Sequence, residues 1–105
     1  MIAVLNEGRI IKYTNGDSFE LIVTADEADD NTMLRFIVSI DETSQPLIDE
    51  QFQYQNGKFI ITLTDTERNS LEIGNYIFKI LLISGSNKTT ELSGDFIVMW
   101  GVEND

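Results

Sequence analysis

The sequence predicts an all-β protein that folds as a two-layer β-sandwich of about seven strands with one short helical turn. Three observations favour this fold. Apolar residues recur at every second position in several segments, which is typical of strands with one buried face. Asn-Gly pairs separate some of these segments, and this pair is common in the two-residue turns of β-hairpins. No long stretch has the period of a helix, and short strands with frequent turns favour a sandwich over a barrel.

The strands and turns follow one another along the whole chain. Asn15-Gly16 predicts a hairpin between the first two strands, and Asn56-Gly57 predicts one between the fourth and fifth. Gly85-Ser86-Asn87 predicts a third hairpin before the last strand. The expected strands lie near residues 9–14, 17–24, 33–40, 47–55, 58–64, 75–84 and 89–99.

One helical turn interrupts the strands near residues 65–70. Thr64 and Glu67 have the spacing of a capping box, in which each residue's side chain accepts a hydrogen bond from the other's backbone. Leu71 is placed to pack beneath this turn. Pro46, the only proline, fits a loop or the start of an edge strand because it cannot donate a ladder hydrogen bond.

Length and charge limit the classes of function. The chain has 105 residues, and we expect residues 1–105 to form a single domain. It carries 7 basic and 18 acidic residues, for a formal net charge of −11. This charge repels nucleic-acid phosphates and anionic lipids, so neither nucleic-acid binding nor membrane insertion is expected. Residues 1–15 lack a basic segment followed by an apolar one, so no signal peptide is expected.

Two residue types that carry much of enzyme chemistry are missing. The chain has no cysteine, which excludes disulfides and thiolate chemistry. It has no histidine, the commonest general base and the commonest transition-metal ligand. No serine therefore has a histidine to activate it, and no glycine-rich phosphate loop follows a strand and opens a helix. We expect a protein that is not an enzyme and has neither a cofactor nor a metal.

The segment NYIFKILLIS, residues 75–84, is apolar on both faces of its expected strand. The face expected to fill the sandwich interior consists of Tyr76, Phe78, Ile80 and Leu82. In the strand near 33–40, the residues expected to point inward are Leu34, Phe36, Val38 and Ile40.

The second face of this strand predicts a contact surface for a partner or a further copy of the chain, since large exposed apolar patches usually mark contacts. The residues expected on it are Ile77, Leu81 and Ile83, with Ile22, Ile37, Ile60, Ile97 and Met99 from neighbouring strands. Two alternatives stay open. In the first, the N-terminal segment MIAVL or a loop covers this face. In the second, some of the residues expected to point outward in fact point inward.

Two acidic segments have the residue types for calcium binding or glycoside hydrolysis. ADEADDN, residues 25–31, places four carboxylates in one loop, but its spacing does not match an EF-hand. Paired carboxylates can hydrolyse glycosides, yet acidic surface residues are far more common than such pairs. The second acidic segment contains Asp41, Glu42, Asp49 and Glu50. We expect both segments to be solvated surface.

SLEIGNYIF, residues 70–78, resembles the E–F corner of immunoglobulin-like domains. In that corner a Gly-x-Tyr sequence introduces a strand, and the tyrosine hydroxyl bonds nearby backbone. Gly74 and Tyr76 would be the corner residues, with a buried ring and a hydroxyl bonded near residues 70–73. Position 78, often cysteine in antibody domains, is Phe78 here, and the third strand has no tryptophan. The resemblance therefore implies an immunoglobulin-like sandwich that is not of the antibody type.

Five segments, the fourth of which contains this corner, occur in order: GDSFELIVTA (16–25), LRFIVS (34–39), PLIDEQF (46–52), FIITLTDTERNSLEIGNYIFKILL (59–82) and ELSGDFIV (91–98). Together they resemble the immunoglobulin-like domains of tailed-phage and prophage structural proteins, especially the N-terminal domain of baseplate upper proteins. The chain departs from that family in its short, very acidic hairpin at 25–31 and in having nothing after residue 105, where other modules usually follow. The resemblance implies a virion protein, assembled in the bacterial host cytoplasm, that docks to other tail or baseplate subunits without catalysis or a cofactor.

A second function class stays open beside this one. A carbohydrate-binding or adhesion module, assisted by calcium at the acidic loop, would use exposed aromatic rings for stacking. The aromatic residues available for such a platform are Tyr13, Tyr54 and Trp100, for which packing in the core or an interface is the stronger expectation.

Overall fold

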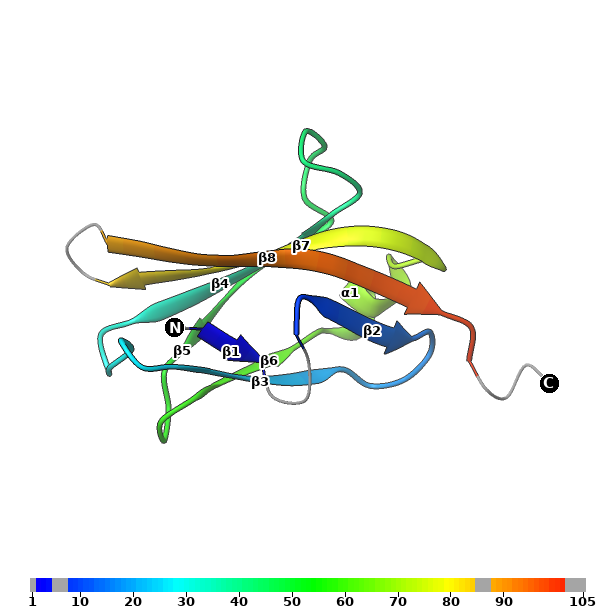
Figure 1. Ribbon diagram of the computed structural model, residues 1–105. Coiled ribbons are helices and arrows are strands. Elements are labelled where there is room, and N and C mark those ends of the chain that lie inside the picture. Colours follow the sequence, from blue (N-terminus) through cyan, green and yellow to red (C-terminus); the bar gives the residue numbers. More distant parts are fainter. Residues whose placement is uncertain (1, 5–7, 85–87, 102–105) are drawn as a thin grey trace.

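The structure is a computed structural model that describes residues 2–4, 8–84 and 88–101. In these ranges the chain forms two β-sheets packed face to face, with one short helix beside them (Figure 1). The elements are β1 (Ile2–Val4), β2 (Ile10–Thr14), β3 (Glu20–Ala25), β4 (Met33–Ser39), β5 (Ile48–Gln53), β6 (Phe59–Thr62), α1 (Asp65–Asn69), β7 (Gly74–Ser84) and β8 (Lys88–Met99). The predicted all-β sandwich is confirmed, and all seven predicted strands are present.

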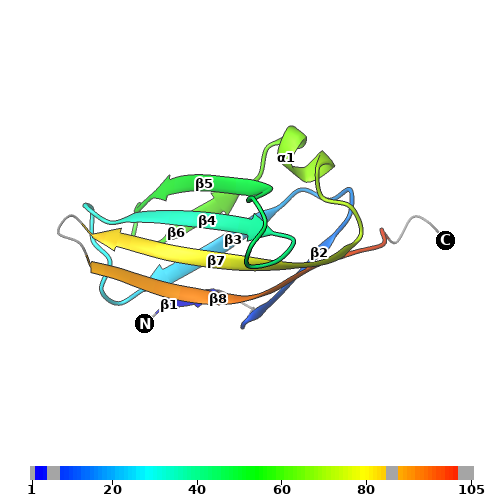
Figure 2. The same cartoon turned by 90° about the horizontal axis from the view of Figure 1, so that it is seen from above.

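The strand order is that of an immunoglobulin-like sandwich. One sheet has the order β1-β3-β6, and the other has the order β2-β8-β7-β4-β5 (Figure 2). Immunoglobulin-like domains place their B and E strands in one sheet and their C, F and G strands in the other. Here β3 and β6 take the first two places, and β4, β7 and β8 take the other three. Adjacent strands are antiparallel except for β2, which runs parallel to β8.

Aromatic side chains from both sheets meet in the core. Phe19, which leads into β3, lies 6.2 Å from Phe36 on β4 and 5.7 Å from Phe96 on β8, measured between ring centroids. Phe78 on β7 lies 6.4 Å from Phe36. These separations are in the range in which aromatic pairs attract one another beyond simple burial. The predicted inward positions of the central strands thus form one continuous core.

One predicted strand end is wrong. Val38 and Ser39 are both buried, so the alternation of β4 breaks between them, and Ile40 is 58% exposed. Ile40 therefore points outward rather than into the core. The cause is local, because β4 ends at Ser39 and the chain leaves the sheet in the loop at residues 40–47.

The hairpin predicted at Asn15-Gly16 is wrong. The amide nitrogen of Asp17 donates to the carbonyl oxygen of Thr14 at 3.0 Å, and Gly16 has a φ of 96°. Asn15 does not share this positive φ, so the turn is of type II, not the hairpin type I′. The flanking strands β2 and β3 lie in different sheets. This turn carries the chain from one layer to the other.

The other two predicted hairpins have different outcomes. Asn56 and Gly57 have φ values of 52° and 83°, as a type I′ turn requires, and Gln55 and Lys58 exchange backbone hydrogen bonds of 2.8 and 3.1 Å. The turn type is confirmed, but β5 and β6 then diverge into separate sheets. β7 and β8 do pair as a hairpin from Ser84 to Gly74, although its turn at 85–87 lies outside the described residues.

The helical turn and the tyrosine corner form as predicted. Glu67 N donates to Thr64 Oγ1 at 3.1 Å and Thr64 N donates to Glu67 Oε1 at 2.8 Å, so the capping box is present and begins α1. Leu71 is buried behind it. The Tyr76 hydroxyl donates to the carbonyl oxygen of Glu72 at 2.7 Å, although its ring is half-buried rather than buried. Within the described residues, no helix is long and apolar enough to span a membrane.

Candidate interaction surface

The residues predicted to share one contact surface lie on opposite sides of the sandwich. Ile22 and Ile60 are register partners on β3 and β6, where they point away from the core of the three-stranded sheet. The remaining six point outward from the five-stranded sheet, and we call that side the outer face. These six are Ile37, Ile77, Leu81, Ile83, Ile97 and Met99. The single predicted surface that included Ile60 is therefore wrong, because the sequence does not specify which sheet each strand joins.

Charged and apolar residues alternate across the outer face. Leu81 on β7 lies between Arg35 on β4 and Glu91 on β8. Lys79 lies between Ile37 and Ser93 in the same two strands. Long charged side chains cover apolar neighbours with their methylene stems. For this reason most of the outward apolar residues are half-buried, and only Ile83 and Met99 of the six reach 38% and 36% exposure.

The loop at residues 40–47 rises from the outer face (Figures 1 and 2). Its tip is held by the carboxylate of Asp41, which accepts hydrogen bonds from the backbone of Thr43 at 3.0 Å and of Ser44 at 2.8 Å. Hydrogen bonds from Ser44 and then Thr43 lower the pKa of the Asp41 carboxyl. The alternative that a loop covers part of this face is thus correct, whereas β1 joins the three-stranded sheet and does not cover it.

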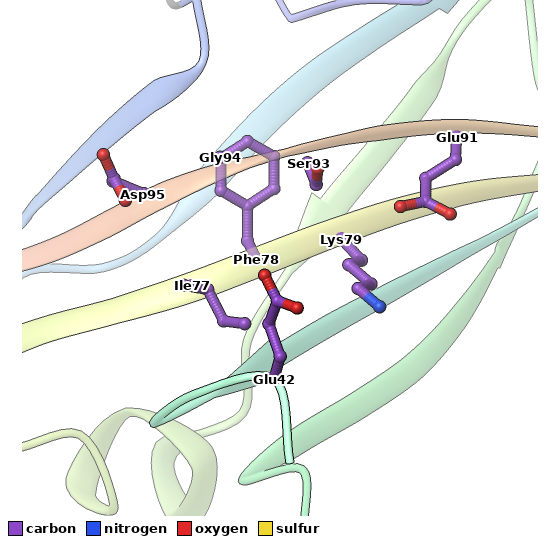
Figure 3. A pocket seen from close by; sticks show the side chains of 8 residues that line it. All are labelled: Glu42, Ile77, Phe78, Lys79, Glu91, Ser93, Gly94 and Asp95. Atoms are coloured by element: carbon purple, nitrogen blue, oxygen red, sulfur yellow. The ribbon is translucent and has the colours of Figure 1, made fainter. Parts of the chain in front are cut away.

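A groove of about 280 Å³ lies between this loop and β8, and we call it the Lys79 groove. Figure 3 shows the Lys79 side chain between those of Glu42, from the loop, and Glu91, from β8. Asp95 lies at the opposite end of the groove, beside Ile77. The lining residues are Glu42, Ile77, Phe78, Lys79, Glu91, Ser93, Gly94 and Asp95.

The Lys79 groove is negatively charged. Three carboxylates, those of Glu42, Glu91 and Asp95, and one ammonium, that of Lys79, give it a formal charge of 1 − 3 = −2. Glu91 and Asp95 flank Ser93, the residue directly opposite Lys79, so both are diagonal neighbours of the lysine. Among the ion pairs of the described residues, none joins these four groups within 4 Å. All four charges therefore stay available to solvent or to a partner.

No model of a known protein family matches this chain, and no curated protein sequence matches it either.

Farther along the outer face, Arg35 and Asp49 form a two-pronged ion pair between β4 and β5. Arg35 Nε donates to Asp49 Oδ1 at 2.7 Å and Nη2 donates to Oδ2 at 2.6 Å. The hydrogen bond from Arg35 lowers the pKa of the Asp49 carboxyl and outweighs the opposing effect of burial, and the charge of Arg35 lowers this pKa further. This pairing fixes the edge strand to its neighbour and leaves Asp49 unsuited to a catalytic pair with Glu50.

Glu50 has a different neighbour. It lies on the inward-facing row of β5 with Ile48 and Phe52, where it approaches Glu67 of α1. A hydrogen bond with Glu67, followed by the charge of Glu67, raises the pKa of Glu50. Burial raises the pKa of Glu67, but hydrogen bonds from Glu50 and Thr64 outweigh it and lower that pKa overall. The carboxylates of the second acidic segment therefore have separate roles. Asp41 holds a turn, Asp49 pairs with Arg35, and Glu50 pairs with Glu67.

In the acidic loop at residues 25–31, one carboxylate accepts hydrogen bonds from nearby residues of the same segment. Asp29 Oδ1 accepts hydrogen bonds from Asn31 N at 2.8 Å and from the Thr32 hydroxyl at 3.2 Å. These bonds form a local turn in which the Asp29 carboxylate replaces a backbone acceptor. In the described part of the chain, no three acidic residues are placed to hold a metal ion together.

The three aromatic residues of the proposed sugar platform do not come together. Tyr13 is buried in the core and donates its hydroxyl to the carbonyl oxygen of Asp17 at 2.6 Å. Tyr54 packs edge-on against Phe59, with ring centroids 5.4 Å apart. Trp100 is 70% exposed. The core packing expected for Tyr13 is confirmed, and Trp100 remains available to a partner.

The structure has an apolar hollow that the sequence did not predict. It has a volume of about 400 Å³ and lies between the loop at 40–47 and the tyrosine corner. Ile40 and Leu47 line its loop side, and Tyr76 lines its corner side. Leu47 is hydrogen-bonded through its amide to the Val38 carbonyl oxygen at 2.8 Å, which holds the loop closed. The available signal was the polar stretch between Ile40 and Leu47, which places both residues at the ends of a loop.

Proposed function

We propose that this chain is a non-enzymatic structural protein of a tailed phage or prophage, a tail or baseplate module that acts through protein–protein contacts. The resemblance of its segments to immunoglobulin-like virion domains supports this proposal. The observation that carries it is the outer face, where half-buried apolar residues alternate with charged ones. Interfaces between separately folded subunits are about as apolar as the rest of a protein surface, so this mixture is compatible with such contacts.

The five-stranded sheet is the better docking side. Its outer face holds six outward apolar residues and the Lys79 groove, whereas the predicted set contributes only Ile22 and Ile60 to the three-stranded sheet. The partners are other virion subunits in the first instance, and a second arrangement pairs copies of this chain. The site of action is the virion, after assembly in the cytoplasm of the bacterial host.

A carbohydrate-binding or adhesion role is the second candidate. Exposed Trp100 favours it, because an aromatic ring in solvent can stack on a sugar. The packing of Tyr13 and Tyr54 against other rings weighs against a multi-ring platform. A glycan array screened with and without calcium tests this role, and binding that is lost in Trp100→Ala would favour it over assembly.

The assembly proposal is tested with Leu81→Asp. Leu81 lies at the centre of the outer face, so a charge there should weaken association and leave most of the fold intact. Thr24→Asp is the matched control, because Thr24 is exposed on β3 in the opposite sheet. The proteins encoded beside this chain are co-expressed with each variant, and complex size is measured by sedimentation. Loss of the complex in Leu81→Asp alone supports the proposal, and equal assembly of both variants contradicts it.

A further inference from the structure

The open shape of the Lys79 groove suits side chains of a partner protein better than a free small molecule. Small-molecule sites usually bury most of the ligand. The Lys79 groove has about 280 Å³ and opens along the sheet, and a smaller hollow of about 170 Å³ continues it on the other side of Glu42. Both hollows share Glu42, Ile77 and Lys79. An extended chain lying across β7 could place successive side chains in the two hollows.

The negative charge of the Lys79 groove favours a cationic side chain in the partner segment. Glu42, Glu91 and Asp95 outnumber Lys79 three to one, and none of the four is paired within the described part of the chain. Ile77 supplies an apolar floor beside them. Arginine and lysine combine an apolar stem with a cationic end, so they match a groove with an apolar floor and an acidic rim.

The overall charge disfavours a second copy as the occupant. Each chain has 18 acidic and 7 basic residues, so two copies would bring like charges together. Like charges placed across an interface raise its free energy, whereas opposite charges also accelerate the encounter of the partners. The partner is therefore expected to be a different, basic protein.

We infer that the Lys79 groove receives an extended basic segment of a neighbouring protein, in which arginine or lysine alternates with aliphatic residues. The cationic side chain lies at the end of the groove away from Lys79, beside the carboxylates of Asp95 and Glu42, and its stem covers Ile77. This inference rests on the proposed assembly function and adds the chemistry of the partner to it.

The direct test uses synthetic peptides and the whole chain labelled with ¹⁵N. The probe is a fluorescein-labelled Val-Arg-Val-Arg-Val peptide, compared with peptides in which glutamine or glutamate replaces arginine. We expect the arginine peptide to shift the amide resonances of residues 77–79 and 93–95, and to bind at least about tenfold more tightly than the glutamine peptide. Equal binding of the two peptides, or shifts elsewhere on the protein, would overturn the inference.

The matched variants separate a specific groove from a general charge effect. Glu42→Gln with Asp95→Asn removes two charges from the groove, and Glu20→Gln with Asp26→Asn removes two from exposed positions on and after β3. We expect the groove pair to weaken peptide binding about tenfold and the control pair less than about twofold at moderate salt. Equal losses would mean that the net charge alone attracts the peptide, which contradicts the inference.

The same variants separate this inference from the assembly proposal. If Leu81→Asp disrupts the complex with co-expressed virion proteins while the groove pair assembles like wild type, assembly through the outer face stands and the basic segment is wrong. If the groove pair also disrupts the complex, with a stronger effect at low salt, the inference is supported.

Discussion

The backbone of Arg9 passes so close to Gly94 that position 94 has no room for a side chain. A Cβ atom on Gly94 would meet the carbonyl oxygen of Arg9 and lie 2.8 Å from its carbonyl carbon. The amide nitrogen of the next residue, Asp95, donates to that carbonyl oxygen at 2.8 Å. Immediately afterwards β2 begins its parallel pairing with β8 at Ile10 and Asp95. Gly94 therefore marks the place where the N-terminal part of the chain joins the five-stranded sheet.

This contact predicts that Gly94→Ala destabilises the protein. Because the neighbouring atoms belong to backbone, they can relieve the overlap only by moving β2 away from β8, at a cost of about 1–3 kcal/mol. Gly8→Ala is the matched control, since a Cβ atom there meets nothing within 4 Å. Chemical denaturation of both variants checks this expectation. Equal midpoints for Gly94→Ala and wild type would show that β2 moves without cost.

The tyrosine corner predicts a different pair of outcomes. Tyr76→Phe removes the hydroxyl that donates to the Glu72 carbonyl oxygen, and the loss of one hydrogen bond costs about 1 kcal/mol. Tyr54→Phe is the control, because the Tyr54 hydroxyl has no hydrogen bond within the described residues, and its loss should cost only a few tenths of a kcal/mol. Urea unfolding of the two variants checks the difference. Equal free energies of unfolding would contradict a stabilising role for the corner bond.

The carboxyl pair of Glu50 and Glu67 predicts a change in titration. Glu67→Gln removes the charge and carboxyl that raise the pKa of Glu50, so that pKa should fall toward its ordinary value. Glutamine also serves in a capping box, so the Thr64 partner is retained and α1 should persist. A carbon-detected NMR titration of Glu50 in both proteins measures the shift. An unchanged Glu50 titration would mean that Glu67 is not its perturbing neighbour.

The ion pair between Arg35 and Asp49 predicts how stability depends on pH. The pKa of Asp49 is lower in the folded chain than its ordinary value of 3.8, so the pair stabilises the protein above that pH. This contribution is lost as the pH falls below 3.8 through the folded-state pKa. Both side chains are more than a third exposed, so screening by solvent and salt keeps this contribution small.

Asp49→Asn should therefore be less stable than wild type near neutral pH and equal to it in strong acid. Urea unfolding at both pH values, at low and at high salt, measures the difference. A difference that persists in acid would point to lost packing or hydrogen bonding rather than lost charge.

The sequence predicted what depends on neighbouring residues and missed what depends on distant ones. Period-two alternation located the strands, and the spacing of Thr64 and Glu67 located α1, because a strand face and a capping box are local features. The parallel pairing of Ile10 with Asp95 joins residues far apart in the chain, and no local pattern specifies it. The same limit explains why Ile22 and Ile60 were placed with the outer face, although they lie in the other sheet.

On the outer face, too, the sequence predicted local features and missed those that depend on distant residues. The outward positions of Ile77 and Leu81 followed from alternation within one strand, and the structure places both there. The groove needed the loop residue Glu42 to come over β7, which depends on how the chain leaves β4. Alternation along β4 predicts an inward Ile40, but the strand ends at Ser39 and Ile40 is exposed.

The two Asn-Gly pairs provide a final test, because the same dipeptide adopts two different turns. Asn56 has a φ of 52°, in the left-handed region where alanine is disfavoured by about 1–2 kcal/mol, and asparagine tolerates it better. Asn15 has no positive φ, so alanine fits there without backbone strain. Asn56→Ala should lower the free energy of unfolding by about 1 kcal/mol, while Asn15→Ala should change it by a few tenths. Asn56→Gly should largely avoid this penalty, because glycine adopts positive φ freely. Thermal or urea unfolding of the three variants measures the differences. Equal losses in Asn56→Ala and Asn15→Ala would contradict the assignment of a type I′ turn to one pair and a type II turn to the other.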